Sequence, residues 1–240
     1  MNVPLAIVGS GKMGRLVEQL APEFGFSVVA RFSSSNIASL SLESLKGATT
    51  AIEFTNPSAA PENLRRLAAL GANTVCGTTG WYGDLPHIRQ LVAKSGTALV
   101  YGANFSVGVN LFMEIVSRAA QLFAQHPEYE AWGWEIHHSA KKDSPSGTLK
   151  RLAEEMRGAG FDGALTLSSN RAGAHTGTHE IGFDSPADTI TLRHTSRSRE
   201  GFARGALQAA RWIAGKKGVF EFRDILPQLK TAGVVAAGSA

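Results

Sequence analysis

The chain has a single cysteine and no long apolar run, and these two absences exclude several classes of protein. Cys76 is the only cysteine among 240 residues, so an internal disulfide and a cysteine-based metal site are excluded. No apolar run approaches the ~18 residues that a membrane-spanning helix needs. The first residues lack a basic segment and lead from a short apolar run into a glycine loop, so we expect no signal peptide. These features favour a cytoplasmic protein with no membrane partner.

Charge is also sparse. Charged residues make up 18% and hydrophobic residues 43% of the chain, a balance that excludes a disordered protein. The formal net charge is +4, but the 24 Lys and Arg residues are scattered, in pairs at most. A nucleic-acid-binding surface concentrates such residues along one element. We therefore expect small anions, and not nucleic acid, as partners.

Over the first hundred residues, short apolar runs alternate with helical patterns. Helical periodicity covers residues 12–24, 58–71 and 84–96, and the apolar runs occupy residues 5–8, 27–32, 50–54, 73–76 and 98–101. The runs are apolar rather than alternating, which is typical of parallel strands buried on both faces. The sequence therefore predicts an α/β fold with a Rossmann-type, doubly wound parallel sheet. Residues 33–36 are expected to be poorly structured.

The pattern changes after Asn104. A long helical pattern over residues 106–125 precedes strand-like segments of period two at 131–138, 165–168, 178–183 and 189–195, with a helix at 146–157. Period-two strands indicate a sheet with unlike faces, antiparallel or mixed. A last helix, at about 200–215, leads to an apolar segment at 219–226. We predict a dinucleotide-binding domain, residues 1–104, rejoined by about 212–240, and a second α+β domain with a mixed open sheet, residues 105–211.

A glycine-rich loop joins the first predicted strand to the first helix. It reads Gly9-Ser10-Gly11-Lys12-Met13-Gly14, a G-x-G-x-x-G pattern. Glycine permits the sharp turn, the approach of backbone N–H groups to a pyrophosphate, and close packing of helix on strand. The helix N-terminus adds partial positive charge. In this strand–helix setting the loop predicts dinucleotide binding.

The end of the second strand carries no carboxylate to hold the ribose hydroxyls. Arg31 stands there with serines at 33–35, and this set suits the 2′-phosphate of NADP better than the ribose of NAD. The alternative is that Arg31 only stacks on the adenine and that the two cofactors are used interchangeably.

Two further loops follow carboxyl ends of predicted strands, where ligands sit in open parallel sheets. We expect them to contact the nicotinamide half, through Gly77, Thr78, Thr79, Gly102, Ala103, Asn104 and Phe105. The alternative for each loop is an ordinary turn.

The densest group of polar residues spans residues 135–148. His137 and His138 are adjacent, so on a regular strand they point to opposite faces. A metal would need a third ligand, and no H-x-x-x-H or cysteine pattern provides one, so we expect no metal. With Lys141 nearby, the histidines indicate acid–base chemistry.

The same segment ends in a helix start. Ser146 can cap the helix, Gly147 lets a ligand approach the backbone, and Thr148 adds a hydroxyl, which together make a carboxylate site. The alternative is a plain capped helix preceded by a solvated Lys-Lys-Asp turn.

The string from Glu135 to Thr148, E-x-H-H-x-x-K-x-D-x-P-S-G-T, resembles the signature of the 4-hydroxy-tetrahydrodipicolinate reductase (dihydrodipicolinate reductase) family. Other similar segments follow the family's order at residues 9–14, 53–57, 77–80, 104–110 and 202–206. The resemblance thus covers nearly the whole chain. The missing acid after the second strand departs from the family pattern, and the chain is short for the family.

The resemblance implies a function and a set of roles. The reaction would be the reduction of 4-hydroxy-tetrahydrodipicolinate by NADPH or NADH with loss of water, in lysine and diaminopimelate biosynthesis. His137 would be the catalytic acid/base and Lys141 the proton donor, with substrate bound by His138, Ser146, Gly147, Thr148 and Arg199. The family also forms a homotetramer through its second domain, which binds the substrate.

Two other functions remain open at this stage. One is a different two-domain NAD(P)-dependent dehydrogenase of a small anionic substrate. The other is a dinucleotide-sensing module that performs no chemistry, which would need neither a proton donor nor a carboxylate site.

Overall fold

The computed structural model describes residues 2–229, and these form two compact units. One unit runs from the N-terminus to Ser106 and resumes at Glu200, and the other is Val107–Arg199. Residues 230–240, which the sequence analysis assigned to the first domain, lie outside the described residues. Among the described residues, no helix is both long and apolar enough to cross a membrane.

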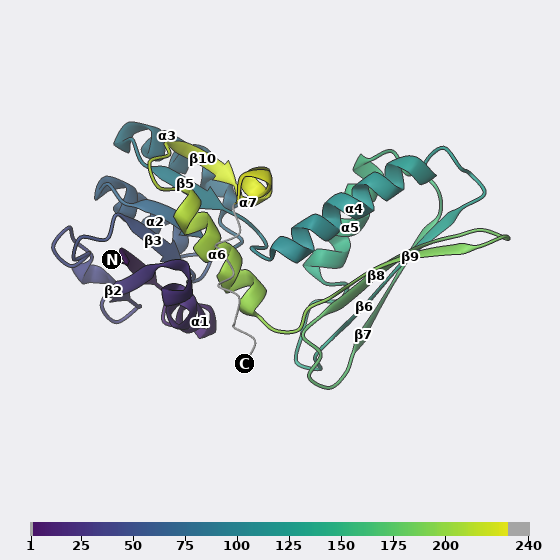
Figure 1. Ribbon diagram of the computed structural model, residues 1–240, viewed down its shortest axis with the longest axis horizontal. Helices are drawn as coiled ribbons and strands as arrows, with labels where there is room; N and C mark the ends of the chain where they lie inside the picture. The colour runs from purple at the N-terminus through teal and green to yellow at the C-terminus, as the bar shows by residue number, and fades with distance from the viewer. Residues whose placement is uncertain (1, 230–240) are drawn as a thin grey trace, which may run out of the picture. The chain divides into compact units, whose positions relative to one another are not determined.

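The first unit is built on a six-stranded parallel sheet (Figure 1). Its strand order is β10-β5-β4-β3-β1-β2, with β1 (Val3–Val8), β2 (Phe26–Phe32), β3 (Thr50–Glu53), β4 (Asn73–Cys76), β5 (Ala98–Tyr101) and β10 (Gly218–Glu221). Strands β3 and β5 are buried along their whole length, and the apolar sequence of β5 predicts this burial. The Rossmann-type fold class is confirmed.

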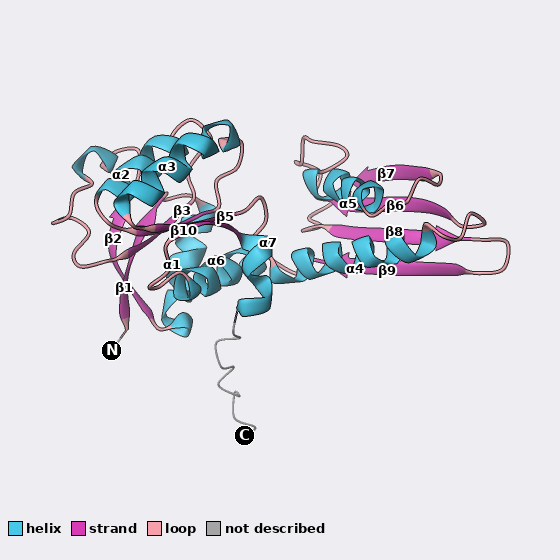
Figure 2. Ribbon diagram, turned by 90° about the horizontal axis from the view of Figure 1, so that it is seen from above, coloured by secondary structure: helices cyan, strands magenta, loops and turns pink. Residues whose placement is uncertain are grey.

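Helices cover both faces of this sheet (Figure 2). Helices α2 (Ala60–Ala69) and α3 (Leu85–Ser95) pack together on one face, and α1 (Lys12–Leu20) and α6 (Glu200–Trp212) pack together on the other. Short helical segments complete the unit: η1 (Ala21–Phe24), η2 (Ile37–Ser39), η3 (Tyr82–Asp84), α7 (Phe222–Ile225) and η4 (Leu226–Gln228).

The described first unit includes α6, a helix that the sequence analysis placed in the second domain. Its small, buried residues, among them Ala203 and Ala206, pack against the sheet. Gly205 permits α6 to approach the loop after β5, since a Cβ there would lie 1.8 Å from the Phe105 carbonyl oxygen. In sequence order, α6 follows directly after the strands of the second unit.

The segment after β2, expected to be poorly structured, is a hydrogen-bonded turn. The Asn36 side chain accepts from the Ser33 N–H at 2.6 Å and donates to the Arg31 carbonyl at 3.0 Å. Arg66, on α2, donates to the Ile37 carbonyl at 2.7 Å and to two further carbonyls in the following residues. Side-chain bonds therefore order residues 33–36 and hold the short helix η2 that follows them.

The second unit is a four-stranded mixed sheet with two helices against one face (Figure 1). The strand order is β7-β6-β8-β9, with β6 parallel to β7 and antiparallel to β8. The elements are α4 (Val107–Phe123), β6 (Glu130–His137), α5 (Gly147–Gly158), β7 (Leu165–Arg171), β8 (Thr178–Asp184) and β9 (Thr189–Thr195). The period-two pattern correctly predicted this mixed sheet.

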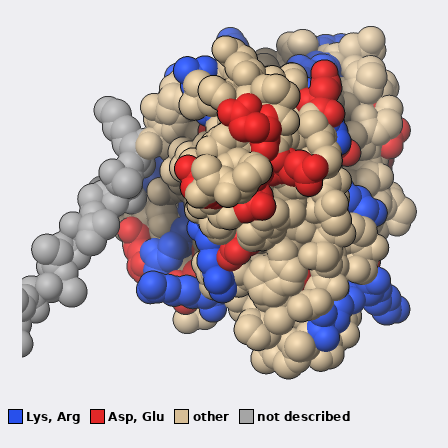
Figure 3. Space-filling view, turned by 90° about the vertical axis from the view of Figure 1, so that its right-hand side faces the viewer, with Lys and Arg blue, Asp and Glu red and all other residues tan. Residues whose placement is uncertain are grey.

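On the face shown in Figure 3, acidic side chains gather near the centre and basic ones stand in small separate groups.

Candidate functional site

Two adjoining cavities open at the carboxyl ends of β1, β3 and β4. The first, of about 250 Å³, is lined by the glycine loop, by Ser33 and Ser34 after β2, and by the segment after β3. The second, of about 320 Å³, is lined by residues 11–13, by the segment after β3, and by Gly77, Thr78 and Thr79. Because β1 lies between β2 and β3, the cavities sit at the topological switch point, where ligands of such sheets bind.

The three glycines of the loop have different structural roles. A Cβ at Gly14 would lie 1.9 Å from the Gly9 carbonyl oxygen, and Gly9 itself has a φ of +116° and packs against the Phe54 carbonyl. Gly11, in contrast, has no heavy atom within 4 Å of a Cβ position and lines both cavities. Gly9 and Gly14 thus let the chain pack on itself, whereas Gly11 leaves room for a ligand beside the start of α1. This open backbone fits a dinucleotide pyrophosphate.

Most of the predicted cofactor residues meet at these cavities, and Arg31 does not line them. The Arg31 guanidinium pairs with Glu18 on α1 at 2.6 Å, and both side chains are exposed. The hydrogen bond to Glu18 raises the pKa of Arg31.

Gly102, Ala103, Asn104 and Phe105 follow β5 and also lie outside the two cavity linings. The Phe105 ring is buried, with its centroid 4.5 Å from that of Phe222 and 6.3 Å from that of Phe54. Since Phe54 lines both cavities, this loop supports their wall through ring contacts.

A buried carboxylate at the end of β3 was not selected from the sequence as a site residue. Glu53, fully buried at the end of β3, accepts from the Cys76 thiol at 3.1 Å, from the Asn63 amide at 3.3 Å, and from the Thr55 hydroxyl. The Thr55 N–H in turn donates to the Thr78 hydroxyl at 2.7 Å. Burial, reinforced by the charge of Glu53, raises the pKa of Cys76. The strand-end rule that selected residues 77–79 would have found the segment after β3 as well.

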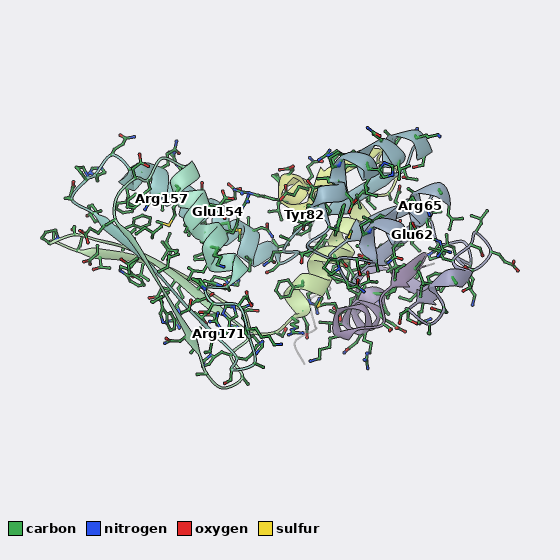
Figure 4. All side chains as sticks on the ribbon, turned by 180° about the vertical axis from the view of Figure 1, so that it is seen from behind. Glu62, Arg65, Tyr82, Glu154, Arg157 and Arg171 are labelled. Carbon is green, nitrogen blue, oxygen red and sulfur yellow. The ribbon has the colours of Figure 1, made fainter. Side chains whose placement is uncertain are left out.

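In the second unit, a buried carboxylate again organises the polar residues. Glu135, on β6, is fully buried and accepts from the Ser146 N–H at 2.7 Å, the Ser169 hydroxyl at 2.9 Å and the Ser146 hydroxyl. Arg171, which extends from the end of β7 (Figure 4), donates to it at 2.9 Å, and the His179 Nε2 lies at 3.2 Å. Burial opposes ionisation, yet the hydrogen bonds from His179, Ser146 and Arg171 lower the pKa of Glu135 far below its ordinary value.

His137 lies on the same buried face of β6, with its side chain only 10% exposed. Its Nδ1 is 3.4 Å from a Glu135 carboxylate oxygen, and a Cβ at Gly177 would lie 2.9 Å from its Nε2. Burial lowers the pKa of His137 to about 4, since the attraction of Glu135 is outweighed by burial and by nearby positive charges. The imidazole is therefore neutral at pH 7. His138 follows the strand and is half-buried; alternation turns it toward the other face.

Lys141 and the start of α5 already hold a carboxylate, that of Asp143. The Lys141 ammonium donates to both Asp143 oxygens, at 2.7 and 2.9 Å. This bond, with a contribution from the Gly147 backbone, lowers the pKa of Asp143. Ser146 caps α5 by accepting from the Leu149 N–H at 3.2 Å, as predicted. Gly147 is exposed and has no heavy atom within 4 Å of a Cβ position, and Thr148 is half-buried.

Glu135, His137 and His179 also present ligand atoms within 4.8 Å of one another, a geometry that could hold a metal ion. The Arg171 guanidinium on Glu135 opposes this, because a second cation would bring like charges together in a buried site. Neither Arg171 nor His179 was selected from the sequence, where each lies on a strand among other polar residues and belongs to no motif. Arg199, which was selected, is exposed at the last position of the second unit.

Comparison with known proteins gives concordant matches over the chain. The model described as dihydrodipicolinate reductase, N-terminus, matches residues 3–105, and the one described as dihydrodipicolinate reductase, C-terminus, matches residues 108–226. The 4-hydroxy-tetrahydrodipicolinate reductase of Christiangramia forsetii is 33% identical over 240 residues, covering 95% of this chain and 99% of the relative. The Archaeoglobus fulgidus protein of the same name is also 33% identical, covering 92% and 99%.

The fold has solved counterparts. A dipicolinate-bound dihydrodipicolinate reductase from Paenisporosarcina sp. TG-14 superposes with a TM-score of 0.76 at 22% identity, covering 94% of this chain and all of that one. An amine dehydrogenase from Mycobacterium smegmatis superposes with a TM-score of 0.65 at 11% identity, covering 96% of this chain and 98% of that one. At these identities the likeness concerns the fold alone.

Proposed function

The chain belongs to the dihydrodipicolinate reductase family, and on this basis we propose that it holds a nicotinamide dinucleotide in its first unit and a cyclic dicarboxylate in its second. It reduces 4-hydroxy-tetrahydrodipicolinate to tetrahydrodipicolinate, with loss of water, in lysine and diaminopimelate biosynthesis. One observation supports the substrate site above all. The Lys141 ammonium, beside the open start of α5, binds the chain's own Asp143 carboxylate, as it would bind a carboxylate of the substrate.

For the cofactor, we assign different parts of the dinucleotide to different residues of the two cavities. The backbone at Gly11 and the N-terminus of α1 would hold the pyrophosphate. The serines at 33 and 34 would face the adenosine half, because they follow β2. Thr78 and Thr79, in the second cavity, would face the nicotinamide half, with residues 102–105 supporting the wall behind it. When bound, the reduced nicotinamide supplies the hydride.

We propose that NADPH is preferred and that Arg31 leaves Glu18 to reach its 2′-phosphate. Opening an exposed ion pair of this kind costs at most about 1 kcal/mol, and the phosphate would be a stronger partner for the guanidinium. Arg31→Ala should raise the KM for NADPH about tenfold, a typical effect of losing one such charge-assisted contact, and leave that for NADH unchanged. Equal effects on both cofactors would show that Arg31 does not select between them.

For the chemistry, the residues of the second unit divide between binding and proton transfer. Gly147 and Thr148 would hold one substrate carboxylate at the start of α5, after Ser146 has set the helix N-terminus, and His138 and Arg199 would contact the rest of the substrate. Lys141 would donate the proton as negative charge develops on the ring. His137 would act beside it as a neutral imidazole, since its pKa of about 4 leaves it uncharged at pH 7.

The test uses neighbouring lysines. Lys141→Ala should lower turnover by on the order of 10²–10⁴ without changing NADPH affinity, and Lys142→Ala is the matched control that should keep wild-type rates. His137→Ala should lower turnover in the same range. Turnover is followed as the loss of nicotinamide absorbance with freshly generated 4-hydroxy-tetrahydrodipicolinate. Wild-type rates for both Lys141→Ala and His137→Ala would refute the assignment.

We also propose a homotetramer, in a cytoplasmic location. Trp132, Trp134 and Ile136 alternate with the buried residues of β6, so they lie on the sheet face opposite α4 and α5. The half-buried tryptophans of this face support the proposal, because a second copy of the chain would cover the apolar surface that they still expose. Trp134→Asp should reduce the mass measured by light scattering, and a wild-type monomer would refute the proposal.

For the cytoplasmic location, the single cysteine is buried and unpaired, which suits a reducing compartment.

A further inference from the structure

A buried ion pair lies behind the residues proposed to touch the substrate. Arg171, at the end of β7, donates from Nη2 to the Glu135 carboxylate on β6 at 2.9 Å, and their side chains are 16% and 0% exposed. The two strands are parallel, with His137 directly beside Arg171. The pair therefore stands at the strand end that carries the proposed catalytic histidine.

Through Glu135, the pair fixes the start of α5. Glu135 accepts both the backbone N–H and the hydroxyl of Ser146, and the same hydroxyl accepts from the Leu149 N–H. Ser146 is itself 2% exposed, so water cannot replace these bonds without an opening of the structure. The carboxylate thus sets where the next two residues, Gly147 and Thr148, present their backbone.

Through Arg171, the pair also fixes the loop that carries the proposed proton donor. The same Nη2 atom that binds Glu135 donates to the Asp143 carbonyl oxygen. Asp143 lies two residues after Lys141, so this bond holds the backbone of the loop that carries the ammonium. One guanidinium nitrogen therefore connects β6 and β7 to the segment between β6 and α5.

We propose that Glu135 and Arg171 are positioning residues for substrate binding: their ion pair holds the start of α5 and the Lys141 loop in a binding-competent arrangement before the substrate arrives. The inference rests on the proposed function, because it requires Lys141 and the start of α5 to bind the dicarboxylate. Either charge alone in this buried position would be destabilising, so the two residues are expected to act as a unit.

The test is a double-mutant cycle read by binding. Glu135→Gln and Arg171→Gln should each weaken binding of pyridine-2,6-dicarboxylate about 10- to 100-fold, since displacements near 1 Å have effects of that order. NADPH affinity should stay unchanged. The double variant should bind no more weakly than the weaker single variant. Arg171→Lys keeps the charge but not the planar guanidinium, so it should show an intermediate loss of dicarboxylate affinity. This variant also serves as the test if a neutral variant does not fold.

The matched control is Arg151→Gln, which removes an arginine from an ion pair within α5, to Glu155 at 2.8 Å, and should leave dicarboxylate binding unchanged. Wild-type dicarboxylate affinity in Glu135→Gln and Arg171→Lys would overturn the inference. Parallel loss of NADPH and dicarboxylate affinity would also overturn it, since that pattern indicates general destabilisation. If Lys141→Ala weakens dicarboxylate binding and these variants do not, the inference alone fails. If Lys141→Ala has no effect, the proposed function fails as well.

Discussion

Replacement of Gly14 by alanine tests the packing of the glycine loop. The new methyl carbon would lie 1.9 Å from the Gly9 carbonyl oxygen, whereas close C···O contacts are about 3.3 Å or longer. Helix α1 and the loop would have to separate by about 1.4 Å. Forced separations in packed interiors cost about 1–3 kcal/mol, and the better helix propensity of alanine offsets at most about 1 kcal/mol.

For a chain of this length, each kcal/mol lost from the free energy of unfolding lowers Tm by about 2–4 °C. We therefore expect Gly14→Ala to lower Tm by several degrees in thermal unfolding followed by circular dichroism. NADPH affinity, measured by fluorescence titration, should fall on the order of 10- to 100-fold because the loop is displaced.

Gly11→Ala is the informative comparison, because a Cβ there has no heavy atom within 4 Å and the backbone is extended, with φ −70° and ψ −172°. It should keep the wild-type Tm and lose NADPH affinity, since its methyl group would enter the space shared by both cavities. Gly83→Ala, also in open space but outside the cavity linings, should change neither quantity. An unchanged Tm and affinity in Gly14→Ala, or an equal loss of Tm in Gly11→Ala, would refute the reasoning.

Three further predictions concern ionisable groups. Asp143→Asn should tighten binding of pyridine-2,6-dicarboxylate about 2- to 5-fold in calorimetry, because it removes an exposed carboxylate that competes for Lys141. Asp162→Asn removes the same charge elsewhere and is the control. Weaker binding in Asp143→Asn would contradict the prediction. Folding lowers the pKa of His137 from 6.5 to about 4, so the unfolded chain binds an extra proton between these values and the wild type loses stability as pH falls through this window. His137→Gln should lose less, measured as the difference in urea unfolding free energy between pH 7 and pH 5; equal differences would show that His137 is not the group responsible. Cys76, buried and with a raised pKa, should resist iodoacetamide at pH 8 in the native protein and react in denaturant; rapid native alkylation would show that the end of β4 is open.

Local pattern was sufficient for the elements and for the helix cap at the start of α5. Apolar runs predicted buried parallel strands such as β5, and period-two segments predicted the mixed sheet. The Ser146 cap was also visible in the sequence, since a serine before Gly147 signals a helix start. These features depend on residues within a few positions of one another.

The partners of Arg31 and Asp143 were not visible in this way. Arg31 was expected at the cofactor, yet it pairs with Glu18, thirteen positions earlier on α1. Asp143 belonged to a solvated turn only under the alternative interpretation of this segment, and its carboxylate accepts two hydrogen bonds from the Lys141 ammonium proposed for the substrate. In both cases a charged side chain found a partner that only the folded backbone brings within reach.

By itself the amino-acid sequence determined the order of strands and helices, the glycine loop and the string from Glu135 to Thr148, because each is encoded in contiguous residues. Only the tertiary structure decided which buried carboxylates organise the two sites. Glu53 gathers Asn63 and Cys76, and Glu135 gathers Arg171 and His179, from elements distant in the chain. A buried charge must be satisfied by whatever donors the fold brings beside it, and no local pattern specifies those donors.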